Sequence, residues 1–125
     1  MYPSRKRIMT VEHHSTLSEG LVSLVASQPD MELVATAAGI EEARKRFAET
    51  SPDITIVDVD MPKRAGLQII GDIRRDRPDA AIIALVSYEW DYLALDAVRM
   101  GASAFLPKDK ITEQLLDLIR ASKRD

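Results

Sequence analysis

Several side chains suited to phosphoryl or metal chemistry stand directly after short apolar runs of the sequence. Glu12 follows the first such run, Asp58 the third, and Lys108 the fifth. Carboxylates that pack together repel unless a proton or a cation lies between them. A hard cation such as Mg²⁺ suits that position, and an aspartate beside it can act as a nucleophile toward phosphorus. These residue types therefore indicate phosphoryl chemistry at a carboxylate, with the lysine neutralising the transferring group.

The apolar runs alternate with amphipathic stretches, which predicts five βα units in a row. We expect strands at 8–11, 32–37, 54–57, 81–86 and 103–106, and helices at 16–28, 41–50, 65–75, 92–100 and 111–121. Strict alternation favours an α/β fold with a doubly wound, five-stranded parallel sheet, the flavodoxin-like (βα)5 arrangement. Ligands of such sheets bind beyond the carboxyl ends of the strands, so Glu12, Asp58 and Lys108 should meet there.

The bulk composition limits the function classes. The 125 residues fit a single domain, 1–125, in which residues 1–6 are expected to be a flexible leader. A net charge of −3 argues against direct binding to a nucleic-acid backbone. The absence of cysteine excludes disulfides and thiolate metal sites. No apolar run is long enough for a membrane span or a signal peptide, so we expect a cytoplasmic protein that does not bind membranes.

Two segments resemble characteristic stretches of response regulator receiver domains. Residues 52–62, PDITIVDVDMP, are similar to the stretch around the phosphorylated aspartate, and residues 101–109, GASAFLPKD, to the fifth strand with its lysine. The resemblance extends over 8–121 and is closest to the branch with a LuxR/NarL-type helix-turn-helix output domain. It implies a two-component phosphorelay in transcription regulation, with a sensor histidine kinase as partner. DNA would be bound only by an output domain that is not in this chain.

The resemblance also implies roles for single residues. Asp58 takes the position of the phosphoacceptor, and Lys108 that of the lysine that contacts the phosphoryl group. Glu12 takes the first acidic position of a Mg²⁺ site, to which Asp58 and the backbone carbonyl of Asp60 also contribute. Phe105 stands where the family has an aromatic switch residue.

Two positions depart from the family pattern. His13 replaces the second acidic residue, normally an aspartate that ligates Mg²⁺. Val86 occupies the position of the switch hydroxyl, and Ser87 lies one residue later, which on a strand reverses the direction of the side chain. Because Mg²⁺ prefers oxygen ligands and imidazole suits transition metals, we expect Mg²⁺ binding to be weakened or lost. The site is thus an atypical receiver site.

The sequence also allows functions other than a phosphorylated receiver. The departures at His13 and Val86 favour, as an alternative, a pseudo-receiver that acts as a phosphorylation-independent interaction or dimerisation module. A phosphatase of the haloacid dehalogenase type is disfavoured because its nucleophile motif follows the first strand, so we do not expect an enzyme. A transition-metal site at His13 and His14 is disfavoured because adjacent side chains tend to diverge. Homodimerisation through the outer helices is left open.

Two features near the site have competing interpretations. The aromatic residues Tyr88, Trp90 and Tyr92 precede or begin the fourth helix, where covering the edge of the core is a commoner use than docking a partner. Pro107 would direct Lys108 toward the crevice if the peptide bond before the proline were cis.

Overall fold

The computed structural model describes residues 5–88 and 91–122 and has the expected α/β fold. The strands are β1 (Lys6–Val11), β2 (Met31–Ala37), β3 (Ile54–Asp58), β4 (Ala81–Val86) and β5 (Ala104–Pro107). The helices are α1 (Ser15–Ala26), α2 (Ile40–Thr50), α3 (Ala65–Asp76), α4 (Tyr92–Met100) and α5 (Ile111–Ala121). Short 3-10 helices at 62–64 and 108–110 precede α3 and α5. All five predicted βα units are therefore present.

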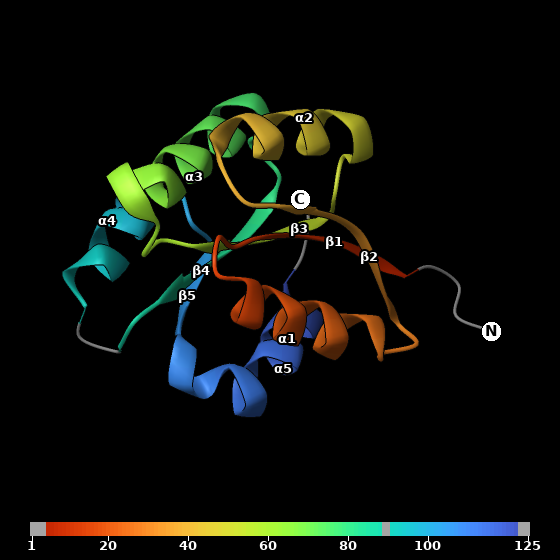
Figure 1. Ribbon diagram of the computed structural model, residues 1–125. Helices are drawn as coiled ribbons and strands as arrows, with labels where there is room; N and C mark the ends of the chain where they lie inside the picture. The colour runs from red at the N-terminus through yellow and green to blue at the C-terminus, as the bar shows by residue number, and fades with distance from the viewer. Residues whose placement is uncertain (1–4, 89–90, 123–125) are drawn as a thin grey trace.

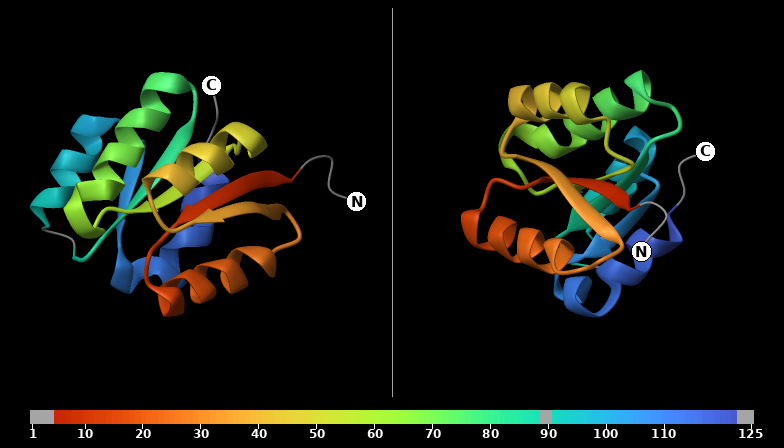
Figure 2. Two further views of the ribbon diagram at one scale, coloured as in Figure 1. Left: turned by 45° about the horizontal axis from the view of Figure 1, so that its top comes forward. Right: turned by 90° about the vertical axis from the view of Figure 1, so that its right-hand side faces the viewer.

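The strands form one parallel sheet in the order β2-β1-β3-β4-β5. Helices α2, α3 and α4 cover one face, and α1 and α5 cover the other (Figure 1). The two further views in Figure 2 keep this separation into layers. The strand order reverses at β1, which has β2 on one side and β3 on the other, and such a switch point is where doubly wound sheets bind ligands.

Alternating side chains of the buried strands fill two separate cores. In β1, Ile8 packs in the layer of α1 and α5 with Leu21 and Leu115. The next residue, Met9, packs in the opposite layer with Phe47. This two-residue period, combined with strands that are apolar on both faces, explains why β4 is buried along its whole length.

The expected leader is shorter than the sequence suggests. Residue Lys6 is already the first residue of β1, and its amine donates to backbone carbonyls of Ile119, Arg120 and Ser122 at 2.9, 2.8 and 2.6 Å. These carbonyls lie at the C-terminal end of α5 and at its C-cap residue, Ser122, where helical donors run out. The Ile119 carbonyl also accepts the Ser122 N–H at 3.1 Å. Residues 1–4 of the expected leader lie outside the described residues.

No helix in the described ranges has both the length and the apolar character needed to cross a lipid bilayer.

Candidate functional site

Glu12 and Asp58 lie side by side at the carboxyl edge of the sheet because β1 and β3 are neighbouring strands. Val11 pairs with Val57 in the parallel register, so the residues that follow them come together. Glu12 is 3% exposed and Asp58 is fully buried. The Glu12 carboxylate is held by the backbone N–H of His14, which donates to Oε1 at 2.9 Å. The structure thus brings together two carboxylates that are far apart in the sequence.

Lys108 reaches the same pair from the end of β5. Its Nζ is 3.0 Å from Asp58 Oδ2 and 3.9 Å from Asp60 Oδ2. The lysine side chain is 22% exposed, so its charge is partly shielded from water. The peptide bond before Pro107 is trans, which corrects the idea that a cis bond would direct the lysine. The lysine is instead placed by the 3-10 helix at 108–110, which begins where β5 ends.

The buried carboxylates shift each other's protonation. Burial raises the pKa of Glu12 to about 7, and the neighbouring Asp58 adds to the rise. Burial also acts to raise the pKa of Asp58, but hydrogen bonds from Glu12, the Asp60 N–H and Lys108 together lower it. Two adjacent carboxyl groups that cannot both ionise freely divide one proton unequally. Below about pH 7, therefore, Glu12 carries the proton and Asp58 the negative charge.

The site thus holds a buried, ionised aspartate in contact with a lysine at the carboxyl edge of the sheet. A profile of the response regulator receiver domain matches residues 8–120. The chain belongs to the response regulator receiver family. Among its relatives is the DNA-binding transcriptional activator DevR/DosR of Mycobacterium tuberculosis, which is 32% identical over 82% of this chain and 48% of its own length.

Solved receiver structures agree with this assignment. A LuxR-family two-component response regulator from Aurantimonas sp. SI85-9A1 superposes with a TM-score of 0.82 at 28% identity, over 96% of this chain and 89% of its own. The response regulator domain of Thermotoga maritima CheB gives a TM-score of 0.84 at 27% identity, over 93% and 94%. These relatives confirm the flavodoxin-like receiver fold and the LuxR/NarL-type resemblance. The chain spans about half the length of DevR/DosR.

Val86, at the predicted switch hydroxyl position, and the next residue, Ser87, face different ways. Val86 is fully buried in the layer of α2, α3 and α4, so its side chain belongs to the core. Ser87, the next residue, donates its hydroxyl to Asp60 Oδ2 at 2.9 Å. The sequence could indicate that the two residues point in opposite directions, but not that the serine would meet Asp60. The hydroxyl thus lies at the rim of the site, beside the second aspartate.

Asp60 contacts the site through several groups. Its backbone N–H donates to Asp58 Oδ1 at 2.8 Å and fixes that carboxylate. Its own carboxylate is 52% exposed and accepts the Ser87 hydroxyl. The predicted role of the Asp60 carbonyl as a metal ligand stays a prediction.

Tyr88 and Tyr92, near the site, do not cover the core edge. Tyr88 and Tyr92 are 58% and 70% exposed, which corrects the favoured expectation that they close the edge of the core. Trp90 lies outside the described residues. Phe105 on β5 is exposed as well, so its ring is turned outward at the predicted switch position.

The donor set at this site fits Mg²⁺ only in part. The Glu12 and Asp58 carboxylates are suitable ligands. Within the described residues no protein N–H donates to Glu12 Oε2, and Asp58 Oδ2 has only its ion pair with Lys108. The position beside them offers the imidazole of His13 where an oxygen is needed for a Mg²⁺ octahedron. The imidazole therefore makes this a poorer Mg²⁺ site than one with oxygen ligands alone.

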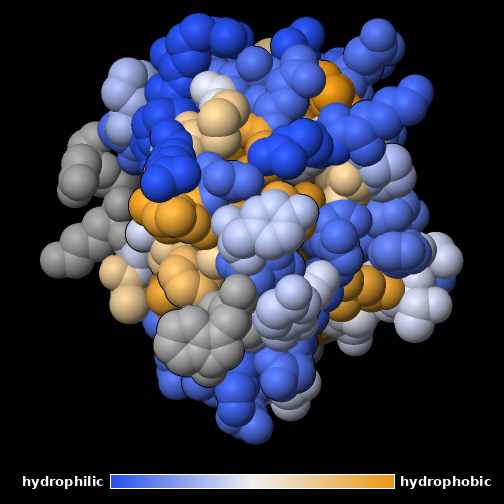
Figure 3. Space-filling model, turned by 90° about the vertical axis from the view of Figure 1, so that its left-hand side faces the viewer, coloured by the Kyte–Doolittle hydropathy of each residue, from blue (hydrophilic) through white to orange (hydrophobic). Residues whose placement is uncertain are grey.

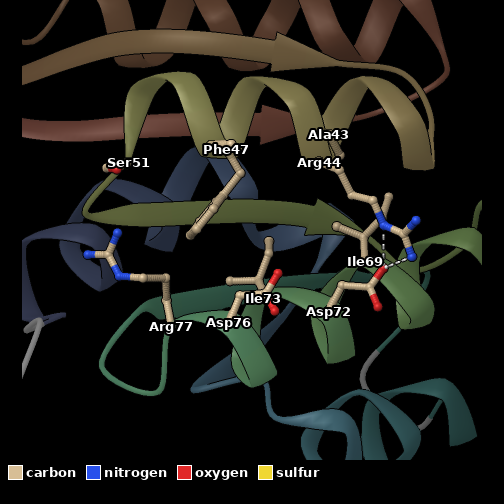
Figure 4. Close-up of a pocket in the computed structure, with 10 residues that line it drawn as sticks. Ala43, Arg44, Phe47, Ser51, Ile69, Asp72, Ile73, Asp76 and Arg77 are labelled. Carbon is tan, nitrogen blue, oxygen red and sulfur yellow. Dashed lines mark hydrogen bonds and ion pairs between the residues drawn. The ribbon is translucent and has the colours of Figure 1, made fainter.

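A separate cavity of about 210 Å³ lies between α2 and α3. Figure 4 shows Phe47 of α2 and Ile73 of α3 pointing toward one another across it, with the Arg44–Asp72 ion pair at one side. None of the residues that line the cavity belongs to the Glu12–Asp58–Lys108 cluster. The cavity is therefore not part of the candidate phosphorylation site.

Proposed function

We propose that this receiver domain accepts a phosphoryl group on Asp58 from a sensor histidine kinase in the cytoplasm. The observation that carries the proposal is the ion pair between Lys108 Nζ and the fully buried Asp58, 3.0 Å apart, at the switch point of the sheet. The family assignment supports it, because the pair lies in the two segments that resemble the phosphorylation site and the fifth strand of receivers.

The chemistry follows from the charge state of Asp58. A carboxylate oxygen of Asp58 attacks phosphorus and forms a P–O bond, while the P–N bond to the donor histidine breaks and its electron pair stays on the imidazole. The Lys108 ammonium neutralises charge on the phosphoryl oxygens. Mg²⁺, held weakly by the two carboxylates and the Asp60 carbonyl, would supply further positive charge. The domain is a switch and not an enzyme that turns over a separate substrate.

The signal would leave through the face built by α4 and β5. The large hydrophobic side chains that are exposed among the described residues all lie between 88 and 105, and they are Tyr88, Tyr92, Leu95, Val98, Met100 and Phe105. Figure 3 shows the side of the molecule on which α4 lies, where hydrophobic atoms emerge between charged ones. Exposed apolar groups of this kind mark interaction sites. A partner protein, a second copy, or a DNA-binding output domain outside this chain would respond there.

Phosphorylation is tested by incubating the chain with acetyl phosphate at several Mg²⁺ concentrations and measuring the intact mass. We expect one labile phosphoryl adduct, most abundant at high Mg²⁺, that Asp58→Asn abolishes. Asp53→Asn, at an aspartate outside the cluster, is the matched control and should label like the unaltered chain.

The absence of an adduct at every Mg²⁺ concentration would contradict the proposal. In that case the pseudo-receiver alternative, an interaction module independent of phosphorylation, would account for the fold and the exposed apolar face.

A further inference from the structure

The two histidines of the chain lie together over the Glu12 carboxylate. Their ring centroids are 3.9 Å apart, and the Nδ1 atoms of His13 and His14 are each 3.4 Å from Glu12 Oε1. The expectation that adjacent histidines diverge is therefore wrong here. The chain bends at His13, between β1 and α1, and His14 is the N-cap residue of α1.

Four potential ligand atoms converge at this turn. One atom each from Glu12, His13, His14 and Asp58 lies within 4.8 Å of every other. A tetrahedral ion with bonds of about 2.0–2.1 Å holds neighbouring ligand atoms about 3.4 Å apart. Both contacts from the imidazoles to Glu12 Oε1 have that length. Small side-chain movements would bring in the Asp58 oxygen.

In the part of the chain that the structure describes, two buried polar atoms of this cluster meet no hydrogen-bonding N–H or O–H group, apart from the proton that Glu12 shares with Asp58 in metal-free protein. Glu12 is 3% exposed, yet its Oε2 has no hydrogen-bond partner within the described residues. The same holds for the buried Nδ1 of His13. Burying such groups unpaired is costly, and a cation between them removes the cost.

We propose that Glu12, His13, His14 and Asp58 form a binding site for a divalent transition metal of the zinc type. The two imidazoles decide against Mg²⁺, which requires hard oxygen ligands, and in favour of an ion that binds nitrogen well. The backbone N–H of His14 orients the Glu12 carboxylate from outside, as partners of metal ligands commonly do. This proposal goes beyond phosphorylation and does not depend on it, since metal binding needs no phosphoryl donor.

The composition of the chain makes the site testable. The sequence has two histidines and no cysteine, so in protein without an affinity tag any metal-bound imidazole belongs to this cluster. We would titrate the full chain with Co²⁺ and follow the visible absorption, then displace Co²⁺ with Zn²⁺. Histidine side-chain ¹⁵N resonances would be recorded in the presence of Zn²⁺ and of Mg²⁺.

One equivalent of Co²⁺ should give the intense absorption of a low-coordinate site, which Zn²⁺ removes and an equal concentration of Mg²⁺ does not. Zn²⁺ should shift the ¹⁵N resonances of both imidazoles. His13→Ala and His14→Ala should each weaken binding by more than about tenfold, because even the partners that support a ligand have that effect. Glu12→Gln should weaken it too, whereas Glu19→Gln, which removes an exposed carboxylate charge from α1, should not.

The proposal would be overturned if Zn²⁺ left the histidine resonances of the unaltered chain unshifted. It would also be overturned if a variant with both His13→Ala and His14→Ala kept the metal affinity of the unaltered chain. Either result would assign the bound metal to scattered surface carboxylates. Circular dichroism of each variant shows whether it is folded, and the resonances of the unaltered chain decide the question even if a variant is not. Since none of these measurements uses acetyl phosphate, failure here leaves the phosphorylation of Asp58 as a separate result.

Discussion

At the scale of single residues, the site is defined by a carboxyl pair that shares one proton. Asp58 is fully buried and yet ionised, because Lys108 and the Asp60 N–H stabilise its charge. Glu12, equally enclosed, has no lysine or arginine within 4 Å among the described residues, and its neighbours are the imidazoles of His13 and His14. The difference in partners, and not in burial, separates the ionised Asp58 from the protonated Glu12.

The raised pKa of Glu12 predicts a pH-dependent stability effect of Glu12→Gln in metal-free protein. Between pH 4.5 and about 7 the unfolded state ionises at Glu12 while the folded state does not, so stability is lost as the pH rises through this window. Glutamine imitates the protonated acid and removes the loss. We expect the variant to gain about 1–3 kcal/mol of unfolding free energy at pH 8 and little at pH 4.5.

The measurement is urea denaturation at the two pH values in the presence of a chelator. Glu19→Gln provides the control, since its carboxylate is exposed on α1. If Glu12→Gln gained as much unfolding free energy at pH 4.5 as at pH 8, the titration of Glu12 would not be the cause of the gain.

At the scale of elements, the close fit of α3 against the end of β3 fixes the position of Asp58. A Cβ on Gly66 would lie 2.8 Å from Val59 Cα and closer still to the Asp58 carbonyl oxygen. Both contacts are with backbone, so the helix would have to move away from Asp58, the proposed phosphoacceptor.

Gly66→Ala should therefore lower the free energy of unfolding by about 2–4 kcal/mol and reduce acetyl phosphate labelling. Gly71→Ala in the same helix is the matched control, since its Cβ would meet only the end of the Met100 side chain, at 2.6 Å. Alanine is favoured over glycine in a helix by about 1 kcal/mol, so this variant should be neutral or stabilised. If urea denaturation gave Gly66→Ala and Gly71→Ala the same free energy of unfolding, the close backbone fit at Gly66 would not be what positions α3.

The elements themselves were predictable because their signals are local. Apolar periodicity located all five helices and five strands, and the bounds of α4, α5 and β4 agree with the structure. The predicted strand at 103–106 is shifted by one residue, since Ser103 precedes β5 and its hydroxyl accepts the Ile82 N–H. Such a shift depends on the neighbouring strand, which no local pattern describes.

The parts of the site that the sequence missed depend on contacts between distant segments or on backbone direction. The hydrogen bond from Ser87 to Asp60 joins two loops, and the contact between the tilted rings of His13 and His14 lies in the bend between β1 and α1. Lys63 and Arg64, in the loop after Asp58, have left-handed φ values of 58° and 56°, although neither is glycine. Nothing in their residue types signals that conformation.

At the scale of the whole molecule, the exposed large hydrophobic side chains of the described residues are concentrated on one face. The two cores are closed around the sheet, but large apolar side chains remain exposed on α4, on the segment before it and on β5. This face lies next to the edge where Lys108 leaves β5, so a change at Asp58 has a short path to it through β4 and β5. That proximity, and not the apolar character alone, supports the face as the output surface.

The two ends of the described chain are tied together by Lys6, whose amine bonds the last carbonyls of α5. A cation at a helix C-terminus satisfies unpaired carbonyls and opposes the negative end of the helix dipole. Lys6→Ala should therefore lower the free energy of unfolding by about 1–2 kcal/mol and increase amide hydrogen exchange in the last turn of α5. Arg5→Ala, at the exposed neighbouring position, removes the same charge without these contacts and should leave both quantities unchanged. If the two variants behave alike, the amine contributes only net charge, and the first strand does not stabilise the last helix.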